Sequence, residues 1–148
     1  MQQLDSNWVY VVVLASGMAP GWGISWIDIV SKRLRYFHPV GRSGWPPTPP
    51  NYIAFRYHAR LQSIHHIDDY EIITNLHTRF EEIPDKEEDT PYFLYTLGPG
   101  FAPAHEVRTG AIYPNGRVWC MLDTLFTART ISEARDTSKV REAKMGQF

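Results

Sequence analysis

The chain contains a single cysteine, Cys120, so no disulfide can form within it. No apolar run approaches the ~18 residues that a membrane-spanning helix needs. The run "WVYVVVLA" at 8–15 is shorter than that and follows no basic region, so neither a membrane span nor a signal peptide is expected. A lone thiol fits a reducing compartment, and we expect a cytoplasmic protein.

Several catalytic signatures are also missing. The sequence has no glycine-rich phosphate loop and no Gly-x-Ser-x-Gly elbow to carry a hydrolase serine. None of the histidines stands at a zinc-type spacing from the cysteine. The apolar neighbours of Cys120 in "RVWCMLD" indicate a buried structural thiol. We therefore expect no cofactor, and a binding protein is favoured over an enzyme.

One group of residues has the chemistry of a metal site. His65 and His66 are followed closely by Asp68 and Asp69. Their surroundings read as a β-strand, in which adjacent side chains point to opposite faces. The two histidines therefore cannot share one metal ion without a bulge, and no metal site is predicted.

The composition is that of a folded domain. Of the 148 residues, 43% are hydrophobic and 21% are charged, which is ordinary for a soluble globular protein. The length suits one domain that covers 1–148. Aromatic residues make up 14%, with five tryptophans and eight tyrosines, and such residues either fill a core or line a pocket.

The net charge of −1 hides an uneven distribution. Residues 1–66 hold six basic and two acidic side chains, and residues 107–148 hold seven and four. Residues 67–106 hold two basic and ten acidic ones. If the two basic ends meet in the fold, they form a surface suited to a polyanion.

The sequence pattern predicts short strands and two helices. Apolar residues at gaps of three and four predict a helix over roughly Ser25 to Arg35, capped by Ser25 or a neighbour. Thr130 and Glu133 form a capping box at the start of a second helix, which Gly146 can end. Strands are expected at 8–14, at 51–57 and 60–67 as a hairpin around His58-Ala59, at 70–76, at 91–98, and at 107–113 and 117–127 on either side of a turn at Pro114 to Gly116.

This order of elements favours an α+β fold. Closely spaced strands with few helices argue against a doubly wound sheet. The best match is a small, partly closed antiparallel β-barrel with peripheral helices. The segment 77–90 between two of the strands reads as a loop with at most one helical turn.

Aromatic and basic residues gather before and within the predicted hairpin. Trp22 and Trp26 lie around the start of the first helix, and Trp45 lies in a proline-rich segment. Arg42 and Arg56 accompany them along the sequence. Aromatic rings stack on nucleobases and arginine pairs with phosphate, so this set predicts a nucleic-acid interface.

The order of a strand, a Gly/Pro loop, a Trp-bearing helix, "NYIAFRYHARLQSIHHIDDYEII", "YFLYTLG" and a closing helix resembles the PUA-like superfamily, in particular its EVE, YTH and ASCH branches. The resemblance implies a nucleic-acid-binding module that holds a modified or flipped base between aromatic residues. It also implies a role in a restriction or defence protein with a fused or partner nuclease. The matching positions are Trp22, Trp26, Trp45 and Tyr57, with Arg42 and Arg56 for the backbone or a base edge.

Either DNA or RNA fits this set, and no membrane partner is expected. Two other functions stay open at this point. One is a small nucleic-acid-processing enzyme centred on His65, His66 and Asp69. The other is a protein-interaction domain that uses the acidic block Glu81 to Asp89.

Overall fold

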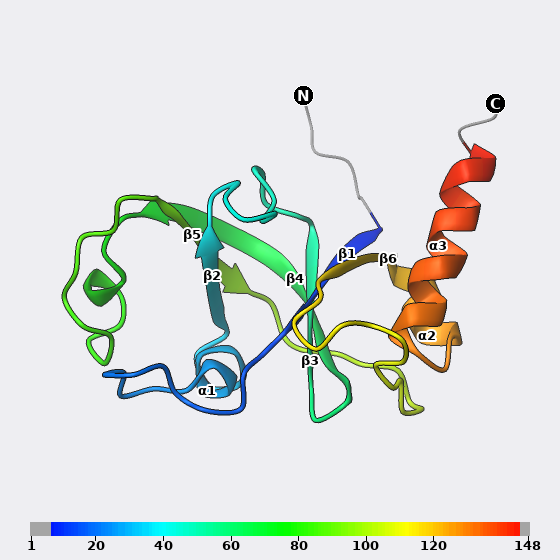
Figure 1. The fold of residues 1–148 in the computed structure, drawn as a ribbon, viewed down its shortest axis with the longest axis horizontal. Coiled ribbons are helices and arrows are strands. Elements are labelled where there is room, and N and C mark those ends of the chain that lie inside the picture. The colour runs from blue at the N-terminus through cyan, green and yellow to red at the C-terminus, as the bar shows by residue number, and fades with distance from the viewer. Residues whose placement is uncertain (1–6, 146–148) are drawn as a thin grey trace. The chain divides into compact units, whose positions relative to one another are not determined.

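Six strands form one mixed sheet in the computed structural model, which describes residues 7–145 (Figure 1). The strand order is β2-β5-β4-β3-β1-β6, and three α-helices accompany it. The elements are β1 (Trp8–Val13), α1 (Trp26–Ser31), β2 (Arg35–Pro39), β3 (Tyr52–Tyr57), β4 (Arg60–Ile73), the 3-10 helix η1 (Leu76–Thr78), β5 (Tyr92–Leu97), β6 (Val118–Met121), α2 (Leu122–Thr127) and α3 (Ile131–Met145).

The predicted α+β class is confirmed, but the antiparallel barrel is wrong. β1 pairs with β3 in parallel, with Val11 opposite Ala54, and the sheet is therefore mixed. A parallel pair needs a long crossover, and the chain provides one between the end of β1 and the start of β3. β2 and β6 stand at the two ends of the strand order, so the sheet is not closed.

The chain divides into two compact units. Unit 1 is built from residues 7–13, 50–65 and 100–145, and unit 2 from residues 14–49 and 66–99. β4 contributes its first part to unit 1 and its second part to unit 2. The expectation of one domain over 1–148 stays a prediction.

Unit 1 is organised around the three strands β3, β1 and β6. β1 lies between its parallel neighbour β3 and its antiparallel neighbour β6. Alternate residues of these strands face α2 and α3, as strand geometry requires. The resulting apolar core includes Val9, Val11, Ala54, Cys120, Leu125, Ile131 and Ala134.

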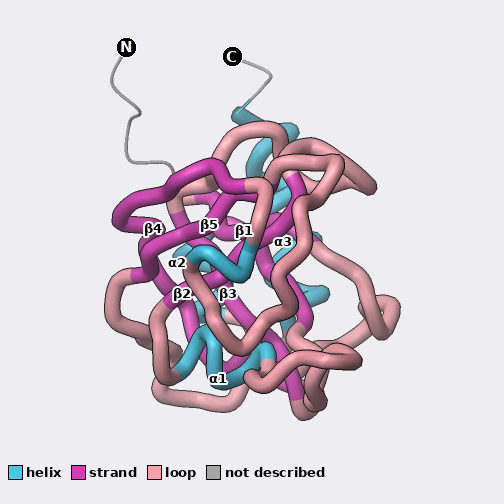
Figure 2. Tube along the Cα trace, turned by 90° about the vertical axis from the view of Figure 1, so that its left-hand side faces the viewer, coloured by secondary structure: helices cyan, strands magenta, loops and turns pink. Residues whose placement is uncertain are grey.

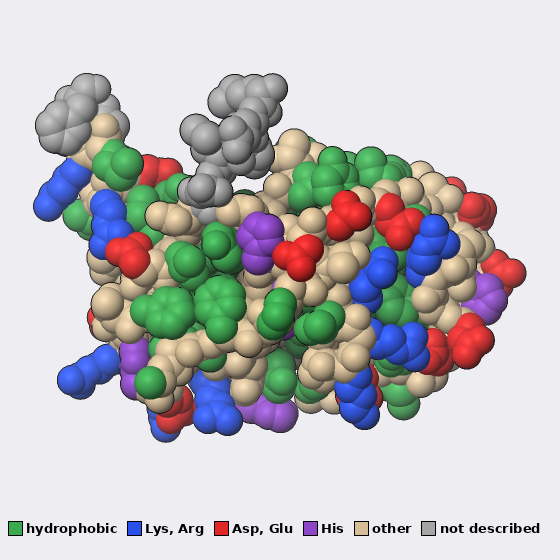
Figure 3. Space-filling model, turned by 180° about the vertical axis from the view of Figure 1, so that it is seen from behind, with side chains coloured by type: hydrophobic (Ala, Val, Ile, Leu, Met, Phe, Trp, Pro, Cys, Tyr) green, Lys and Arg blue, Asp and Glu red, His purple; other side chains and the backbone are tan. Residues whose placement is uncertain are grey.

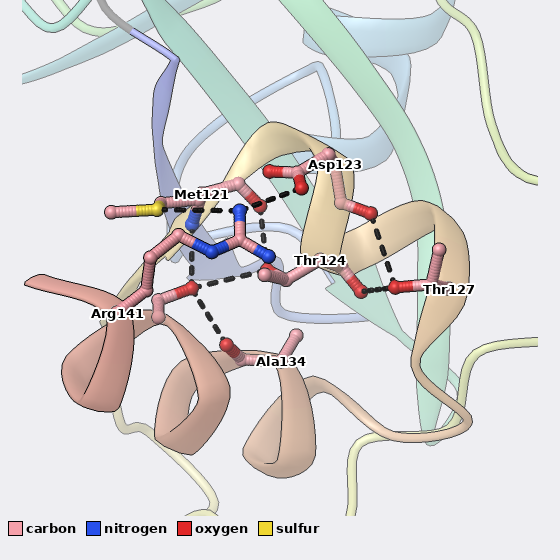
Figure 4. A network of polar contacts seen from close by, with 7 residues as sticks. Met121, Asp123, Thr124, Thr127, Ala134 and Arg141 are labelled. Atoms are coloured by element: carbon pink, nitrogen blue, oxygen red, sulfur yellow. Dashed lines mark hydrogen bonds and ion pairs between the residues drawn. The ribbon is translucent and has the colours of Figure 1, made fainter. Parts of the chain in front are cut away.

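Buried hydroxyl groups attach α3 to the sheet and to α2 (Figure 4). Ser138 is fully buried, and its Oγ accepts a hydrogen bond from the Met121 N–H at 2.8 Å. The same hydroxyl donates to the Ala134 carbonyl at 2.7 Å. Thr124, at the start of α2, donates to the Met121 carbonyl at 2.6 Å. Both polar groups of the Met121 backbone are thus satisfied where β6 passes into α2.

Unit 2 contains β2, β5 and the second part of β4, which pair in antiparallel fashion (Figure 2). One face of these strands carries Phe37 and Leu94. These residues pack against α1 and the segment around η1, through Ile29 and Phe80 among others. The other face carries the aromatic residues that form the candidate site.

The first predicted helix is shorter than expected. Its cap is confirmed, because the Asp28 N–H donates to Ser25 Oγ at 3.1 Å. The helix ends at Ser31, however, and Leu34 adopts a left-handed backbone with φ of 53°. The residues that follow form β2, since their aromatic and alternating side chains pair with β5 across the sheet.

The predicted hairpin is confirmed, and its turn explains how a poor turn pair is accommodated. β3 and β4 are neighbours in the sheet, with two residues between them. His58 and Ala59 have φ values of 54° and 63°. Two consecutive positive φ values are the geometry of a type I′ turn, which matches the twist of the flanking strands.

The predicted strand-turn-strand pattern over 107–127 is only partly correct. The turn is present, because the Gly116 N–H donates to the Tyr113 carbonyl at 2.9 Å. The segment 107–113 is irregular and has a single isolated bridge pairing, at Arg108. The segment 117–127 is a strand only to Met121 and then turns into α2, which buries Leu125 in the core.

The second predicted helix begins as expected. The Glu133 N–H donates to Thr130 Oγ1 at 3.0 Å, so the N-terminal cap is confirmed. Gly146, the predicted stop, lies outside the described residues. No helix among residues 7–145 combines the length and apolar character needed to cross a membrane.

Candidate functional site

A cluster of rings lies on the second face of β2 and β5 in unit 2, the face opposite the apolar core described above. His38 lies opposite Phe93, and Tyr36 lies opposite Tyr95. Because side chains alternate along a strand, these four share the face that points away from Phe37 and Leu94. The four are almost fully buried, with exposed fractions between 0% and 4%.

Hydrogen bonds at both ring nitrogens orient His38. Nδ1 lies 2.8 Å from the Pro39 carbonyl, which can only accept, so Nδ1 carries a hydrogen. Nε2 lies 2.5 Å from the Tyr95 hydroxyl and forms a hydrogen bond with it. These two contacts fix the orientation of the imidazole plane within the cluster.

Trp45 covers that plane. Its ring stacks on His38 with centroids 4.6 Å apart and an interplanar angle of 8°. The tryptophan is half-buried. It belongs to the Trp45 loop, which we define as residues 40–47, and its N–H donates to the Arg42 carbonyl at 3.0 Å. Ser43 and Gly44, with φ of 55° and 83°, make the tight turn between them.

Two further predicted residues pack against Phe37 on the other face of the strands, and one of them also contacts this cluster. Trp22 and Trp26 are half-buried and lie 5.2 Å apart between ring centroids. Trp26 lies 5.9 Å from Tyr36, which in turn lies 6.4 Å from Trp45. The three tryptophans singled out in the sequence therefore belong to one ladder of ring contacts in unit 2.

Arg42 differs from the other basic residues of unit 2. Its side chain is exposed, and Nη1 donates to Thr90 Oγ1 at 2.5 Å. It is in no ion pair within the part of unit 2 that the structure describes. Figure 3 shows basic and acidic side chains lying next to one another on the face in view. The pairs in unit 2 are Lys32–Asp28, Arg33–Glu82, Arg35–Glu71, Arg79–Glu71 and Lys86–Glu88.

Arg56 has a different environment. It is on β3 in unit 1 and is 5% exposed. Its Nη2 donates to the carbonyls of Tyr113, Pro114 and Gly116, at 3.0, 3.3 and 2.8 Å. Nε is buried without a partner, and burial lowers the pKa of the guanidinium. Arg56 thus anchors the turn that precedes β6.

Tyr57 also belongs to unit 1. Its ring is half-buried and lies 5.1 Å from the His58 ring in an edge contact. Its carbonyl accepts a hydrogen bond from Gln62 Nε2 at 2.8 Å. Neither Arg56 nor Tyr57 is part of the ring ladder of unit 2.

The three residues of the alternative catalytic site, His65, His66 and Asp69, have separate hydrogen-bond partners. His65 is 3% exposed and hydrogen-bonds Ser63 Oγ through Nε2 at 2.8 Å. His66 is exposed and bonds Asp68 Oδ1 through Nδ1 at 2.8 Å. The two histidines thus alternate across β4, as a strand requires. Asp69 accepts a hydrogen bond from the next backbone N–H. The described residues contain no group of three or more His, Cys, Asp or Glu side chains arranged to hold a metal ion.

Cys120 is buried as predicted. Its side chain is in the core of unit 1 with an exposed fraction of 0%. Burial raises the pKa of this thiol to about 12, with small opposing effects from Arg135 and Asp136. The reactive thiolate is therefore absent near neutral pH.

The acidic block Glu81 to Asp89 is tied into unit 2 by polar contacts. Its carboxylates meet partners just after α1, just after β4 and at the N-terminal cap of η1. The contacts are Glu82 with Arg33, Asp85 with Asn75, and Glu87 with Thr74.

Sequence reasoning missed His38, Tyr36 and Tyr95 as site residues. The signal was present as alternation in "RYFHP" and "YFLYTL", where every second residue is aromatic or His. It was hidden because the helical pattern of the preceding residues ran on into β2.

Comparison of the chain with protein-family models, with curated proteins and with solved structures finds no match in any of the three.

Proposed function

We propose that this protein is a nucleic-acid-binding module that stacks an unpaired, modified or flipped base on the aromatic cluster around Trp45. The observation that supports this most is the pairing of Trp45 with Arg42 on one tight turn. Trp45 offers a half-buried ring, and Arg42 is exposed and has no carboxylate partner among residues 7–145. A stacking ring beside a cation is the combination used to hold a base and its phosphate.

The residues beneath Trp45 favour base stacking. The stack on His38 and the hydrogen bond between Tyr95 and His38 hold the ring plane of Trp45 in place. Binding to a rigid plane loses less conformational entropy than binding to a mobile side chain. Trp26 contacts Tyr36 of this cluster, although both Trp22 and Trp26 pack against Phe37 on the other face of the strands.

Charge limits how unit 2 binds. Its segments contain six Lys and Arg residues against ten Asp and Glu residues, a net charge of −4. Such a unit repels a long phosphate backbone. We therefore propose local recognition of one base with its phosphate at Arg42.

We also propose that the protein is related to the PUA-like superfamily, with an open, mixed sheet in place of a barrel. We further propose that it is cytoplasmic and acts with a partner nuclease in a defence system. Arg56 and Tyr57 are not part of the proposed contact, because both belong to unit 1 and Nη2 of the buried Arg56 donates to backbone carbonyls.

The test is the affinity of short labelled DNA and RNA single strands, bare and base-modified, measured by fluorescence anisotropy. Loss of one stacking ring costs roughly 1–3 kcal/mol of binding. Trp45→Ala should therefore weaken binding about fivefold or more, and Arg42→Gln should weaken it and reduce its dependence on salt.

Matched controls exist in the chain. Trp119 is 40% exposed and also rests on another ring, that of Tyr10 at 4.6 Å. Arg79 is an exposed arginine of unit 2 held by Glu71. Trp119→Ala and Arg79→Gln should leave affinity unchanged. If Trp45→Ala binds as tightly as Trp119→Ala, the proposal is wrong.

A further inference from the structure

Two exposed segments of unit 1 run side by side. The segments 101–108 and 126–130 are far apart in sequence but are joined by backbone contacts (Figure 1). His105 Nε2 donates to the Ala128 carbonyl at 2.8 Å. Further along, Arg108 forms a parallel bridge pairing with the second segment. Together the two segments form a strip with rings at one end and arginines at the other.

The ring end is an exposed stack. Phe101 and Phe126 lie 6.1 Å apart between centroids at an interplanar angle of 10°. Their exposed fractions are 37% and 39%, so the pair is open to solvent. Tyr52 meets Phe101 edge-on at 6.4 Å and supports it from the sheet. Large rings left this exposed are typical of binding surfaces.

The arginine end places like charges opposite each other. Arg60 and Arg108 are direct bridge partners, so their side chains leave the same side of the backbone. Both are exposed, as is Arg129 on the neighbouring segment. Like charges at directly opposed positions destabilise a strand pair.

The chain compensates this repulsion weakly. Glu106 lies 3.8 Å from Arg108 Nε, and both side chains are well exposed, at 47% and 74%. Such surface pairs contribute little. Arg60 and Arg129 form no ion pair among residues 7–145. An external anion would relieve the repulsion.

The charge of the whole unit points the same way. The segments that form unit 1 contain nine Lys and Arg residues and five Asp and Glu residues, a net charge of +4. This is the opposite sign to unit 2. A basic surface with exposed rings has both the charge and the stacking groups that a single strand uses.

We propose that this strip binds a single-stranded nucleic acid, with bases against Phe101 and Phe126 and phosphates at Arg60, Arg108 and Arg129. The exposed ring pair favours this ligand over an acidic peptide, because each nucleotide carries an aromatic base beside its phosphate, whereas Asp and Glu side chains have no aromatic ring to stack. The inference rests on the proposed function for its class of ligand, but it concerns a separate surface. It predicts that binding strengthens with strand length.

The test compares labelled dT and rU strands of three and twelve nucleotides with a poly-glutamate peptide, over a series of salt concentrations. The variants are Phe126→Leu, which keeps apolar packing without a ring, and the double variant Arg60→Gln with Arg108→Gln. Trp45→Ala and the exposed-lysine change Lys139→Gln serve as comparisons. Thermal unfolding of each variant establishes that it is folded.

For the twelve-nucleotide strand we expect Phe126→Leu to weaken binding about fivefold or more. The double arginine variant should weaken it and flatten the slope of log affinity against log salt by about 1.4, or ~0.7 per lost contact. Lys139→Gln should change neither affinity nor slope by as much.

The outcomes separate this inference from the proposed function. If Phe126→Leu and the arginine pair have no effect while Trp45→Ala weakens binding, the strip is not used and the Trp45 site stands. If the strip variants weaken binding and Trp45→Ala does not, the inference stands and the Trp45 site fails. Binding of poly-glutamate that matches the strands in affinity and variant dependence overturns the inference, as does failure of all strands to bind.

Discussion

His38 and Tyr95 form a polar pair inside an aromatic cluster. The imidazole donates from Nδ1 to a carbonyl and forms a hydrogen bond at Nε2 with the tyrosine hydroxyl. Both side chains are nearly free of solvent, with exposed fractions of 1% and 0%. A buried polar atom without a partner is costly, so this bond determines how the ring beneath Trp45 is oriented.

Tyr95→Phe should destabilise the protein by about 1–3 kcal/mol, because it removes the buried hydrogen bond between the tyrosine hydroxyl and Nε2 of His38. The free energy of unfolding from equilibrium urea denaturation measures this. Tyr113→Phe, at a tyrosine that is 84% exposed, should change stability by no more than about 0.5 kcal/mol. Equal stability of Tyr95→Phe and Tyr113→Phe would show that the hydrogen bond between Tyr95 and His38 does not stabilise the fold.

The environment of Arg56 differs from the one that its residue type suggested. An arginine near tyrosines in the sequence predicted a ligand contact, and the structure places the side chain in a buried position beneath a turn. Strand alternation already places Arg56 on the same face as Ala54, which is in the core. The sequence did not reveal the carbonyls that receive it, because they come from a turn about 60 residues away.

At the level of elements, α3 depends on one serine. Ser138 bridges the Met121 N–H and the Ala134 carbonyl within the core (Figure 4). At the exposed margin, Arg141 pairs with Asp123 at 2.6 Å. The surface pair contributes little to the free energy of unfolding. The buried serine contributes more, because it accepts a hydrogen bond from a backbone N–H that is shielded from water.

Ser138→Ala should lower the free energy of unfolding by about 1–3 kcal/mol, since it leaves the Met121 N–H buried and unpaired. Thr137→Ala, at the exposed preceding position of the same helix, is the matched control and should change stability little. Chemical denaturation monitored by circular dichroism reports both. A Ser138→Ala variant as stable as Thr137→Ala would refute this role.

Elements with strong local signals were predicted well from the sequence. β1 is a continuous run of β-branched and aromatic residues, and α3 starts at a capping box. β2 and α2 were missed because they are short and depend on their partners. β2 is a strand because β5 pairs with it, and α2 is a helix because it buries Leu125 against the sheet.

At the scale of the whole molecule, the sequence predicted part of the charge distribution but did not predict the sheet topology. The second basic end lies in unit 1, but four of the six basic residues of the first end (Lys32, Arg33, Arg35 and Arg42) lie in unit 2 with most of the acidic middle. The first basic end therefore contributes to the basic unit through Arg56 and Arg60. The parallel pairing of β1 with β3 was not predictable, because it joins strands that a long crossover separates.

The candidate site was partly predictable for the same reason. Trp22, Trp26, Trp45 and Arg42 lie in segments whose composition already marked them, and all four belong to unit 2. The buried His38 under Trp45 follows from the sheet register, which no local pattern encodes.

The central claim is that a base stacks at Trp45, and intrinsic tryptophan fluorescence during titration with short single strands tests it most directly. The native chain and Trp119→Phe should show saturable, salt-sensitive quenching, and Trp45→Phe should lose most of that change because the stacking indole is gone. Quenching that persists undiminished in Trp45→Phe, or no quenching of the native chain by any strand, would contradict the account.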